Sequence, residues 1–339
     1  MVKQIVVITE RLPGQPNRGF CKLSGVEIVR VFPHRAGGQL SKLSQYMRYG
    51  IQNLLYASIP GLISKIQPDV VLVHSSFHNY FNLLTPFLRK ISKQVPLIAD
   101  VRDHQLPVTE LGQLEIYDAI IACSLNVLRH VSLKESLTSR IKHIPVIQED
   151  LGLRRNAPAS LKKHGLNDVS YMLFAGLIKA DKGVNLLLEA YKVLCCRGRT
   201  EELVLVGQAK DLKLVELALA IAGVRSLGPV PRDELLDLMS CSRLVVNLSG
   251  SEGMPRSSLE ALALGVPVAL PADIPEFEQH CHEHVIKSQN PEVVADDLER
   301  LLDHAASPRY PVSEHHVDHV CQMYGEIFEN VRLEKSFAE

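Results

Sequence analysis

Two carboxylates, Glu252 and Glu260, are separated by a seven-residue spacer that contains a Gly, a Pro and two Ser residues. The apolar residues 244–248 predict a buried strand before them, and residues 259–264 predict a helix after the intervening turn. Backbone N–H groups of residues 253–258 would then point at a bound ligand, and the amino terminus of a helix favours an anion. The pattern predicts a site for an anionic ligand with a polyhydroxyl neighbour.

The strand and helix that would carry these carboxylates belong to a longer alternating series. Alternation of short apolar runs with helical patterns is typical of parallel β-α units, in which ligands bind outside the carboxyl ends of the strands. We expect strands at residues 171–175, 203–206 and 225–230, helices at residues 184–194, 212–222 and 233–239, and, after a short edge strand at 285–287, helices at 291–304 and 314–331.

The first half of the chain shows a similar alternation. The segment 9–25 contains two Pro and two Gly residues before Gly25, too broken for a crossover helix, so we interpret it as a loop with at most one helical turn. The repeated β-branched, apolar runs favour a parallel sheet with both faces covered. They lie at residues 5–8, 26–32, 70–74, 96–101 and 119–123.

Residues 40–59 have apolar side chains at three- and four-residue spacing, which predicts an amphipathic helix that ends near Pro60 and Gly61. Its flanks carry basic and tyrosine side chains. Such a flank could rest on an anionic membrane surface, or it could be an ordinary solvated helix face. Peripheral membrane contact is therefore one of two open interpretations.

Composition places the chain among two-domain, water-soluble proteins. With 339 residues and 46% hydrophobic residues it can bury two cores, and a net charge of −1 gives no general case for nucleic acid. Its apolar runs are shorter than the roughly 18 residues of a membrane span, and residues 5–8 are too short for a signal peptide, so we expect a cytoplasmic protein. Seven Cys without a CxxC pair favour reduced thiols.

A polar, Pro-containing stretch at residues 142–167 predicts the domain boundary. We expect an α/β architecture of two Rossmann-like domains that face each other across a central cleft. The first domain covers residues 1–160 and the second covers 161–312. A helix within residues 313–335 should pack back onto the first domain, because its apolar residues form one stripe, namely Val317, Val320, Cys321, Tyr324, Ile327, Phe328 and Val331.

Four segments of the second half resemble the family 4 retaining glycosyltransferases, nucleotide-sugar enzymes of the GT-B fold. They are FAGLIKADKGVNLLLEAY (174–191), GPVPRDEL (228–235), SEGMPRSSLEALALGVPV (251–268) and IPE (274–276), in the order and spacing of that family. Thinner matches in the first half are QPDVVLVHS (67–75), PLIADVRD (96–103) and YDAIIACS (117–124). The resemblance implies a donor-binding second domain and a more variable acceptor-binding first domain.

The resemblance implies roles for individual residues. Glu252 would contact hydroxyls of the donor sugar, Glu260 would bind the ribose, and Lys182 would stabilise the leaving diphosphate without a metal ion. Arg102 and Asp103, beside His104, would lie across the cleft near the acceptor. The other implied donor-binding residues are Gly14, Gly176, Val230, Gly253, Met254, Pro255, Ser258 and Leu259.

The chain departs from the family pattern at several positions. Relatives usually have an Arg directly after the Gly that corresponds to Gly176, where this chain has Leu177, so one of two diphosphate cations is missing. Lys179, Arg18 or Arg102 could substitute for it. In addition, Ala272 and Asp273 replace a double Gly before the IPE segment, and Arg102 stands where many relatives have His.

The resemblance implies transfer of a hexose from a nucleoside diphosphate sugar, such as a UDP-sugar or GDP-sugar, to a glycan, a lipid-linked sugar or a small-molecule acceptor, as in polysaccharide biosynthesis. It implies a retaining mechanism with no metal or other cofactor.

Two alternatives are an inactive GT-B subunit that binds nucleotide-sugar or a partner protein, and an isomerase or phosphorylase, whose patterns the sequence lacks. The His-rich segment 279–285 could suggest a metal site, but we expect it to be a loop.

Overall fold

The carboxyl-terminal half contains a six-stranded parallel sheet in the order β10-β9-β8-β11-β12-β13. The computed structural model describes residues 5–11, 18–20, 26–33, 59–75, 85–102, 107–149, 151, 157–250, 252–304, 306 and 308–337. The strands are β8 (Tyr171–Ala175), β9 (Glu202–Val206), β10 (Val224–Gly228), β11 (Leu244–Val246), β12 (Val268–Pro271) and β13 (Val285–Ile286). All five residues of β8 are buried, as expected for a sheet covered on both faces.

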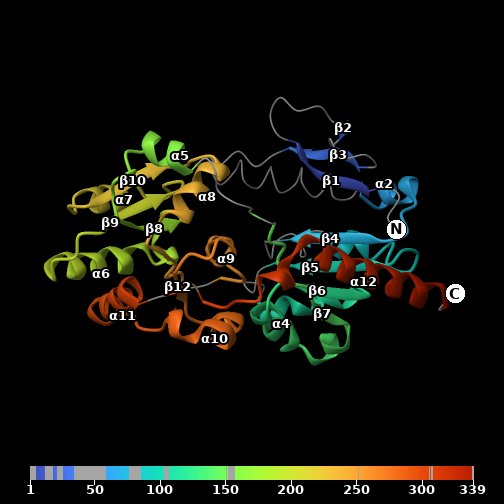
Figure 1. Cartoon of the computed structure of the whole chain (residues 1–339). Helices are drawn as coiled ribbons and strands as arrows, with labels where there is room; N and C mark the ends of the chain where they lie inside the picture. The colour runs from blue at the N-terminus through green and yellow to red at the C-terminus, as the bar shows by residue number, and fades with distance from the viewer. Residues whose placement is uncertain are drawn as a thin grey trace.

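Helices cover this sheet on both faces (Figure 1). Two separate hydrophobic clusters show which helix lies on which face, because each contains side chains of different helices. On one face lie α6 (Val184–Cys196), α7 (Leu212–Leu219) and α11 (Pro291–His304). On the other face lie α8 (Arg232–Ser240), α9 (Arg256–Ala263) and α10 (Pro275–Cys281), and α5 (Ala157–Lys163) packs on α8. The predicted alternation of strands and helices in this half is confirmed.

A four-stranded parallel sheet in the order β4-β5-β6-β7 forms the centre of the other half. A further sheet pairs β1 and β3 in parallel and β2 and β3 antiparallel. Helix α4 (Leu125–Ser132) and the 3-10 helices η1 (Val108–Ile116) and η2 (Glu135–Arg140) pack on the four-stranded sheet. The strands are β1 (Ile5–Arg11), β2 (Arg18–Phe20), β3 (Val26–Pro33), β4 (Val71–Ser75), β5 (Leu97–Val101), β6 (Ala119–Ala122) and β7 (Ile141–His143).

Three local predictions are wrong. The segment 9–25 contains the end of β1 and all of β2, since pairing with β3 overrides its broken sequence pattern. Helix α2 (Ile59–Ile66) is helical across Pro60 and Gly61, where the end of a helix was predicted; residues 40–58 lie outside the described part. The segment 279–284 is helical and not a loop, because α10 is followed by the 3-10 helix η4 (His282–His284), and Val285 begins β13.

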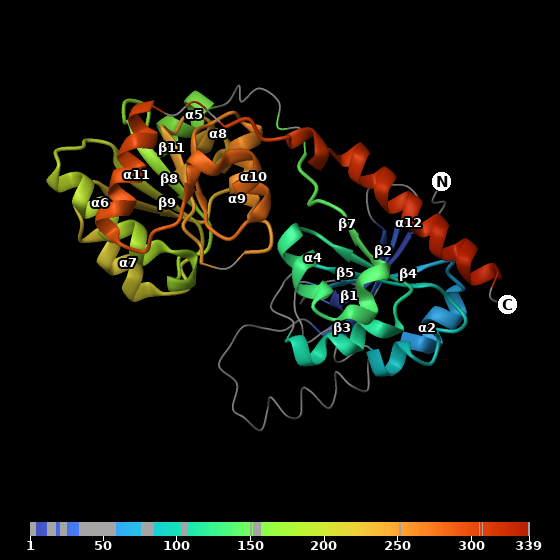
Figure 2. The ribbon, with the colours of Figure 1, turned by 90° about the horizontal axis from the view of Figure 1, so that it is seen from below.

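The last helix, α12 (Val317–Phe337), runs along the four-stranded sheet (Figures 1 and 2). Its buried residues Val320, Ile327 and Val331 belong to one hydrophobic cluster with residues of β5 and β6. Val317 and Cys321 are exposed, so the buried stripe is narrower than predicted. The position of the boundary between the two domains stays a prediction. Among the described helices there is none with the length and apolarity needed to cross a membrane.

The start of α6 depends on Gly183, whose φ of 71° lies in the left-handed region. A Cβ atom added there would lie 2.1 Å from the carbonyl oxygen of Leu248, at the end of the neighbouring strand β11. Gly198, just after the same helix, also has a left-handed φ of 85°, but an added Cβ would meet no atom within 4 Å. Comparison of Gly183 with Gly198 therefore distinguishes the effect of a left-handed backbone conformation from the effect of a steric clash.

We expect Gly183→Ala to lower the free energy of unfolding by about 2–4 kcal/mol, since it adds a clash to the strain of a left-handed Ala. Gly198→Ala should cost about 1 kcal/mol, from the backbone conformation alone. Urea denaturation of both variants measures the difference. Equal losses would show that the contact with Leu248 does not constrain this loop.

Candidate functional site

The crevice between β8 and β11 is the point at which the chain changes direction across the sheet. From β8 it continues to β9 and β10 on one side, and then crosses to β11 on the other. The helices that follow, α6 and α9, accordingly leave toward opposite faces. In open parallel sheets, ligands bind outside the carboxyl ends of the strands at such a point. Both predicted acidic residues and the predicted Lys follow these two strands.

Backbone contacts hold the two loops of the crevice together. The N–H of Gly250 donates to the carbonyl of Asp181 at 3.3 Å, and the Ser249 hydroxyl donates to the same oxygen at 3.4 Å. Asn247 fixes the second loop from inside, because its side chain accepts from the Ser249 N–H at 3.0 Å and donates to the Ser258 hydroxyl at 3.2 Å. The loop before α6 and the loop before α9 therefore form one unit.

Lys182 and Glu252 form an ion pair across these two loops. Their side chains are 23% and 20% exposed, so the pair lies at the surface of the crevice without being buried in it. An ammonium and a carboxylate in direct contact neutralise each other, yet both can still be reached by a ligand. The structure thus brings together the two residues that the sequence assigned to the diphosphate and to the sugar.

Glu260 is 8% exposed and is paired with Arg232, whose Nη2 lies 3.0 Å from the Glu260 Oε1. The Nη1 of the same guanidinium lies 2.9 Å from Glu149 Oε2. Burial raises the pKa of Glu260 above its ordinary value of 4.5, and the charge of Arg232 opposes that rise. Sequence reasoning missed Arg232, although it stands within the segment GPVPRDEL that carried the resemblance.

The start of α9 offers backbone groups to the crevice. Its N-cap residue, Pro255, makes no side-chain capping bond. Met254 and Leu259 are buried in the hydrophobic cluster beneath the sheet, so their side chains pack and only their backbone can meet a ligand. The Ser258 hydroxyl is fully buried and bound by Asn247. These predicted donor-binding positions thus serve first to fix the turn.

Gly253 lies where the two halves of the chain meet. A Cβ added to it would lie 3.1 Å from the carbonyl oxygen of Arg102, 3.8 Å from the Cys123 Sγ and 3.8 Å from a methyl group of Val127. The loop that carries Glu252 therefore rests against the carboxyl ends of β5 and β6. Only a residue without a side chain fits there without displacing its neighbours.

The Arg102 guanidinium points away from that contact and into a buried polar network. Its Nε lies 2.9 Å from Asp100 Oδ1, and its Nη2 donates to Asp100 Oδ2 at 2.9 Å and to the Tyr324 hydroxyl at 2.6 Å. Tyr324 and His74 also contact Asp100, at 3.1 and 2.7 Å. Asp100 is 1% exposed, and burial opposes its charged form, but the hydrogen bond from His74 and the charge of Arg102 hold its pKa below 3.8. A direct role of Arg102 in catalysis stays a prediction.

The structure describes some of the remaining residues that were predicted to bind the donor or the acceptor, and others lie outside its described part. Gly176 donates its N–H to the Val206 carbonyl at 2.9 Å, and Val230 is half-buried beside the sheet core, after the turn at Gly228. Leu177 is 37% exposed. Lys179, a proposed substitute cation, pairs with Asp181 at 2.6 Å. Gly14, Asp103 and His104 lie outside the described residues, and nothing is described of the Arg18 side chain.

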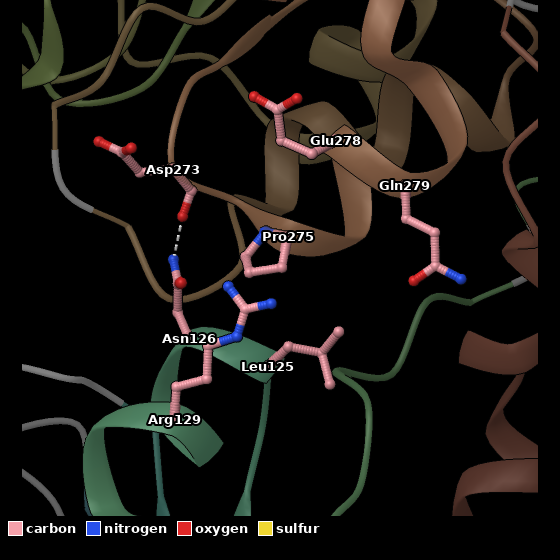
Figure 3. A pocket seen from close by; sticks show the side chains of 7 residues that line it. All are labelled: Leu125, Asn126, Arg129, Asp273, Pro275, Glu278 and Gln279. Carbon is pink, nitrogen blue, oxygen red and sulfur yellow. Dashed lines mark hydrogen bonds between the residues drawn. The ribbon is translucent and has the colours of Figure 1, made fainter. Parts of the chain in front are cut away.

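A second contact between the halves joins α4 and α10. Glu276 Oε1 accepts the N–H of Leu125 at 2.7 Å, and the Asn126 side chain donates to the carbonyl of Asp273, which has a left-handed φ of 66°. Figure 3 shows the neighbouring cavity, of about 550 Å³, with the Arg129 guanidinium directed toward Pro275. It is lined by Leu125, Asn126, Arg129, Asp273, Pro275, Glu278 and Gln279.

The His-rich segment contributes to packing. His284 is buried, and its Nδ1 lies 3.0 Å from the carbonyl oxygen of Val268, while burial lowers its pKa below 6.5. Cys281 is buried in the core beside the sheet, and burial raises its pKa to about 11. In the described part of the chain, no group of three or more His, Cys, Asp or Glu side chains is arranged to hold a metal ion.

Residues 157–314 match the family model described as Glycosyl transferases group 1. The match covers somewhat less than half of the chain and includes β8 to β13, so this part of the chain resembles domains of that type. Over 114 residues the chain is 32% identical to the O-antigen chain mannosyltransferase B of Escherichia coli, a match that covers 32% of this chain and 30% of that protein. The matched region thus spans less than a third of the curated relative's length.

Two solved structures share the fold over nearly the whole chain. The crystal structure of Anabaena Alr3699/HepE in complex with UDP and glucose has a TM-score of 0.68 at 16% identity, and covers 90% of this chain and 86% of that one. The alpha,alpha-trehalose 6-phosphate synthase of Burkholderia multivorans has a TM-score of 0.73 at 11% identity, and covers 100% and 98%. The predicted GT-B fold, with its α/β architecture and parallel sheets, is confirmed.

The Asp100 network makes a prediction about stability and pH. The pKa of Asp100 is lower in the folded protein than in the unfolded chain. The ionised Asp100 therefore stabilises the fold fully above its unfolded-state pKa, and this stabilisation is lost as the pH falls through its folded-state pKa. Asp100→Asn should lower the free energy of unfolding by about 3 kcal/mol at neutral pH, because the buried Arg102 loses its counterion. The difference from the wild type should shrink below about pH 4.

Urea denaturation across this pH range measures the effect. Asp303→Asn serves as the control, because Asp303 forms an ion pair with Arg199 at 2.7 Å on the protein surface. It should give a much smaller loss, since exposed pairs are screened by solvent. An Asp100→Asn loss that does not change with pH would contradict the assignment.

Proposed function

We propose that the protein is a retaining glycosyltransferase that moves a hexose from a nucleoside diphosphate sugar to a hydroxyl of a glycan, a lipid-linked sugar or a small-molecule acceptor. The observation that carries the proposal is the contact of Lys182 with Glu252 at the β8/β11 crevice, inside the domain of the glycosyl transferases group 1 type. A structural relative crystallised with UDP and glucose supports a nucleotide-sugar as the donor.

Donor binding would exchange partners within this ion pair. The Lys182 ammonium would turn to the diphosphate, which carries negative charge, and the freed Glu252 carboxylate would accept hydrogen bonds from sugar hydroxyls. Since each charge leaves one partner for another, neither is left without one. Lys182 then stabilises the charge that develops on the departing diphosphate.

Retention of the anomeric configuration would follow from attack on the face that the diphosphate leaves. The bond from the anomeric carbon to the phosphate oxygen breaks, the bond to the acceptor oxygen forms, and the acceptor proton passes to the leaving phosphate oxygen. A double displacement would instead need a carboxylate nucleophile on the opposite face of the sugar. Glu252 is held by Lys182 beside the proposed diphosphate position, which favours an orienting role.

One feature favours a second candidate, a GT-B subunit that binds nucleotide-sugar without transferring it. Leu177 leaves the crevice with one cation fewer, Lys179 is paired with Asp181, and Arg102 is paired with Asp100. Donor hydrolysis separates the candidates. Slow release of nucleoside diphosphate without acceptor indicates an enzyme, whereas binding with no release, with or without acceptors, indicates the subunit.

Glu252→Gln should lower kcat by about 10²–10³-fold on the true donor and acceptor, because a neutral amide orients the sugar less strongly than a carboxylate. The matched control is Glu189→Gln, since Glu189 also pairs with a Lys, at 2.7 Å, but on the surface of α6. It should leave kcat unchanged. An unchanged kcat in Glu252→Gln would refute the assigned role, and NMR of the product anomer tests retention.

Binding of nucleotide can be tested without an acceptor. A nucleoside diphosphate present at about a hundred times its Kd should stabilise the folded protein by about 2.7 kcal/mol, which raises its melting temperature. We expect such a rise with UDP, GDP or their sugars, and the same rise with EDTA present, since Lys182 replaces a metal ion in the proposal. A rise that disappears with EDTA would contradict metal independence.

A further inference from the structure

Arg232 links two carboxylates that come from different parts of the chain. It begins α8 directly after the turn 228–231, and its two terminal nitrogens contact Glu260 and Glu149 at 3.0 and 2.9 Å. We propose that Arg232 is a positioning residue that couples occupancy of the donor pocket to the segment that connects the two domains. The inference rests on the proposed function, in which Glu260 binds the ribose of the donor.

The contact with Glu260 controls the charge of that carboxyl group. A buried carboxylate is unfavourable unless it is paired, and burial raises the pKa of Glu260. The charges of Arg232 and Arg256 lower it again, and the charge of Glu149 raises it. The ionised carboxylate accepts hydrogen bonds on both of its oxygens and more strongly than the protonated group, so Arg232 keeps Glu260 in the form that best binds two ribose hydroxyls.

Other titratable groups on the elements packed against α9 have partners of their own. On α8, Glu234 binds Lys163 and His164, and Asp237 accepts from the Ser160 hydroxyl at 2.6 Å. On the 3-10 helix η5 (Val312–His315), His315 lies 2.8 Å from the carbonyl oxygen of Val146 and 3.0 Å from the Tyr310 hydroxyl. Asp233 and Glu314 complete the charged groups on these two elements.

The contact with Glu149 reaches the connection between the domains. Glu149 follows Gln148, whose N–H donates to the carbonyl of His315 at 2.8 Å and which pairs in parallel with His316. The two chain segments that join the halves of the protein therefore run side by side at this point. Glu149 is 66% exposed, so its ion pair contributes little stability by itself. Its effect is to restrain the Arg232 guanidinium.

Ribose hydroxyls that donate to Glu260 compete with Arg232 for the same carboxylate. When the ribose takes Oε1, the guanidinium shifts, and its contact with Glu149 shifts with it. The reverse also holds, because coupling between two sites is reciprocal. A change at Glu149 therefore alters nucleotide affinity through Arg232 near pH 8, whereas at lower pH the charge of Glu149 also acts on the pKa of Glu260 directly.

The test measures the Kd of UDP and of GDP by calorimetry on the full chain, for the wild type, Arg232→Met, Arg232→Lys, Glu149→Gln and the double variants. Arg300→Met is the matched control, because Arg300 is 45% exposed against 43% for Arg232 and also pairs with an acid on its own domain, Asp297. Circular dichroism verifies that each variant is folded.

Near pH 8, Arg232→Met should bind the nucleotide at least as tightly as the wild type does, because the guanidinium that competes with the ribose for Glu260 is gone. Its affinity should fall more steeply than that of the wild type between pH 8 and pH 6, because burial raises the pKa of Glu260 and the loss of the Arg232 charge raises it further. The wild type should change less than about twofold over the same range. Arg232→Lys should restore the pH profile of the wild type, since Lys keeps the charge.

Glu149→Gln should weaken binding about two- to fivefold in the wild type, because the released guanidinium engages Glu260 more fully. Measured near pH 8, it should have no effect in Arg232→Met or in Arg232→Lys, whose single ammonium does not bridge both carboxylates. Two results would overturn this inference and leave the proposed function intact, provided that the wild type binds nucleotide. One is a pH profile of Arg232→Met that equals that of the wild type. The other is an effect of Glu149→Gln that is equal in all backgrounds. A wild type that binds neither nucleotide would overturn the proposed function itself.

Discussion

The approach of Gly183 to the carbonyl group of Leu248 is the constraint on which the site depends. It brings the loop after β8 against the loop after β11, although the two helices that follow lie on opposite faces of the sheet. A side chain at Gly183 would separate them. Because the loops touch, the Lys182 ammonium and the Glu252 carboxylate meet at the edge of the crevice, where a ligand can reach both.

Shielded carboxylates are paired with cations at several places in the structure. Glu252 and Glu260 each hold a cation that comes from another loop or helix, and Asp100 holds Arg102, two residues further along the chain. A carboxylate that is partly or fully shielded from water needs such a partner, because its burial without one is costly. For the proposed donor this has a direct consequence. In the proposed function, binding would be an exchange of partners, in which the ligand supplies phosphates to the cations and hydroxyls to the carboxylates.

The two halves of the chain touch close to this site. Gly253 lies against the carbonyl oxygen of Arg102, and Glu276 accepts the N–H at the start of α4. Helix α12 adds a third connection, since Tyr324 binds both Asp100 and Arg102. The network that fixes the Arg102 side chain thus also fixes the backbone against which the Glu252 loop rests. Contacts in the first half therefore help to fix the loop of the second half that carries Glu252.

The sequence by itself determined the parallel α/β architecture and most strand and helix positions, because apolar periodicity is a local property of the chain. Its resemblance to a glycosyltransferase family also implied roles for Lys182, Glu252 and Glu260, and these roles stay predictions. Tertiary structure alone decided which charges meet. Arg232 and Glu149 are 83 residues apart, and Arg102 and Tyr324 are 222 apart. The pairing of β2 with β3 was decided in the same way, because a partner strand outweighs weak local preference. An ion pair or a strand pairing depends on the partner that folding brings near, and local sequence carries no record of that partner.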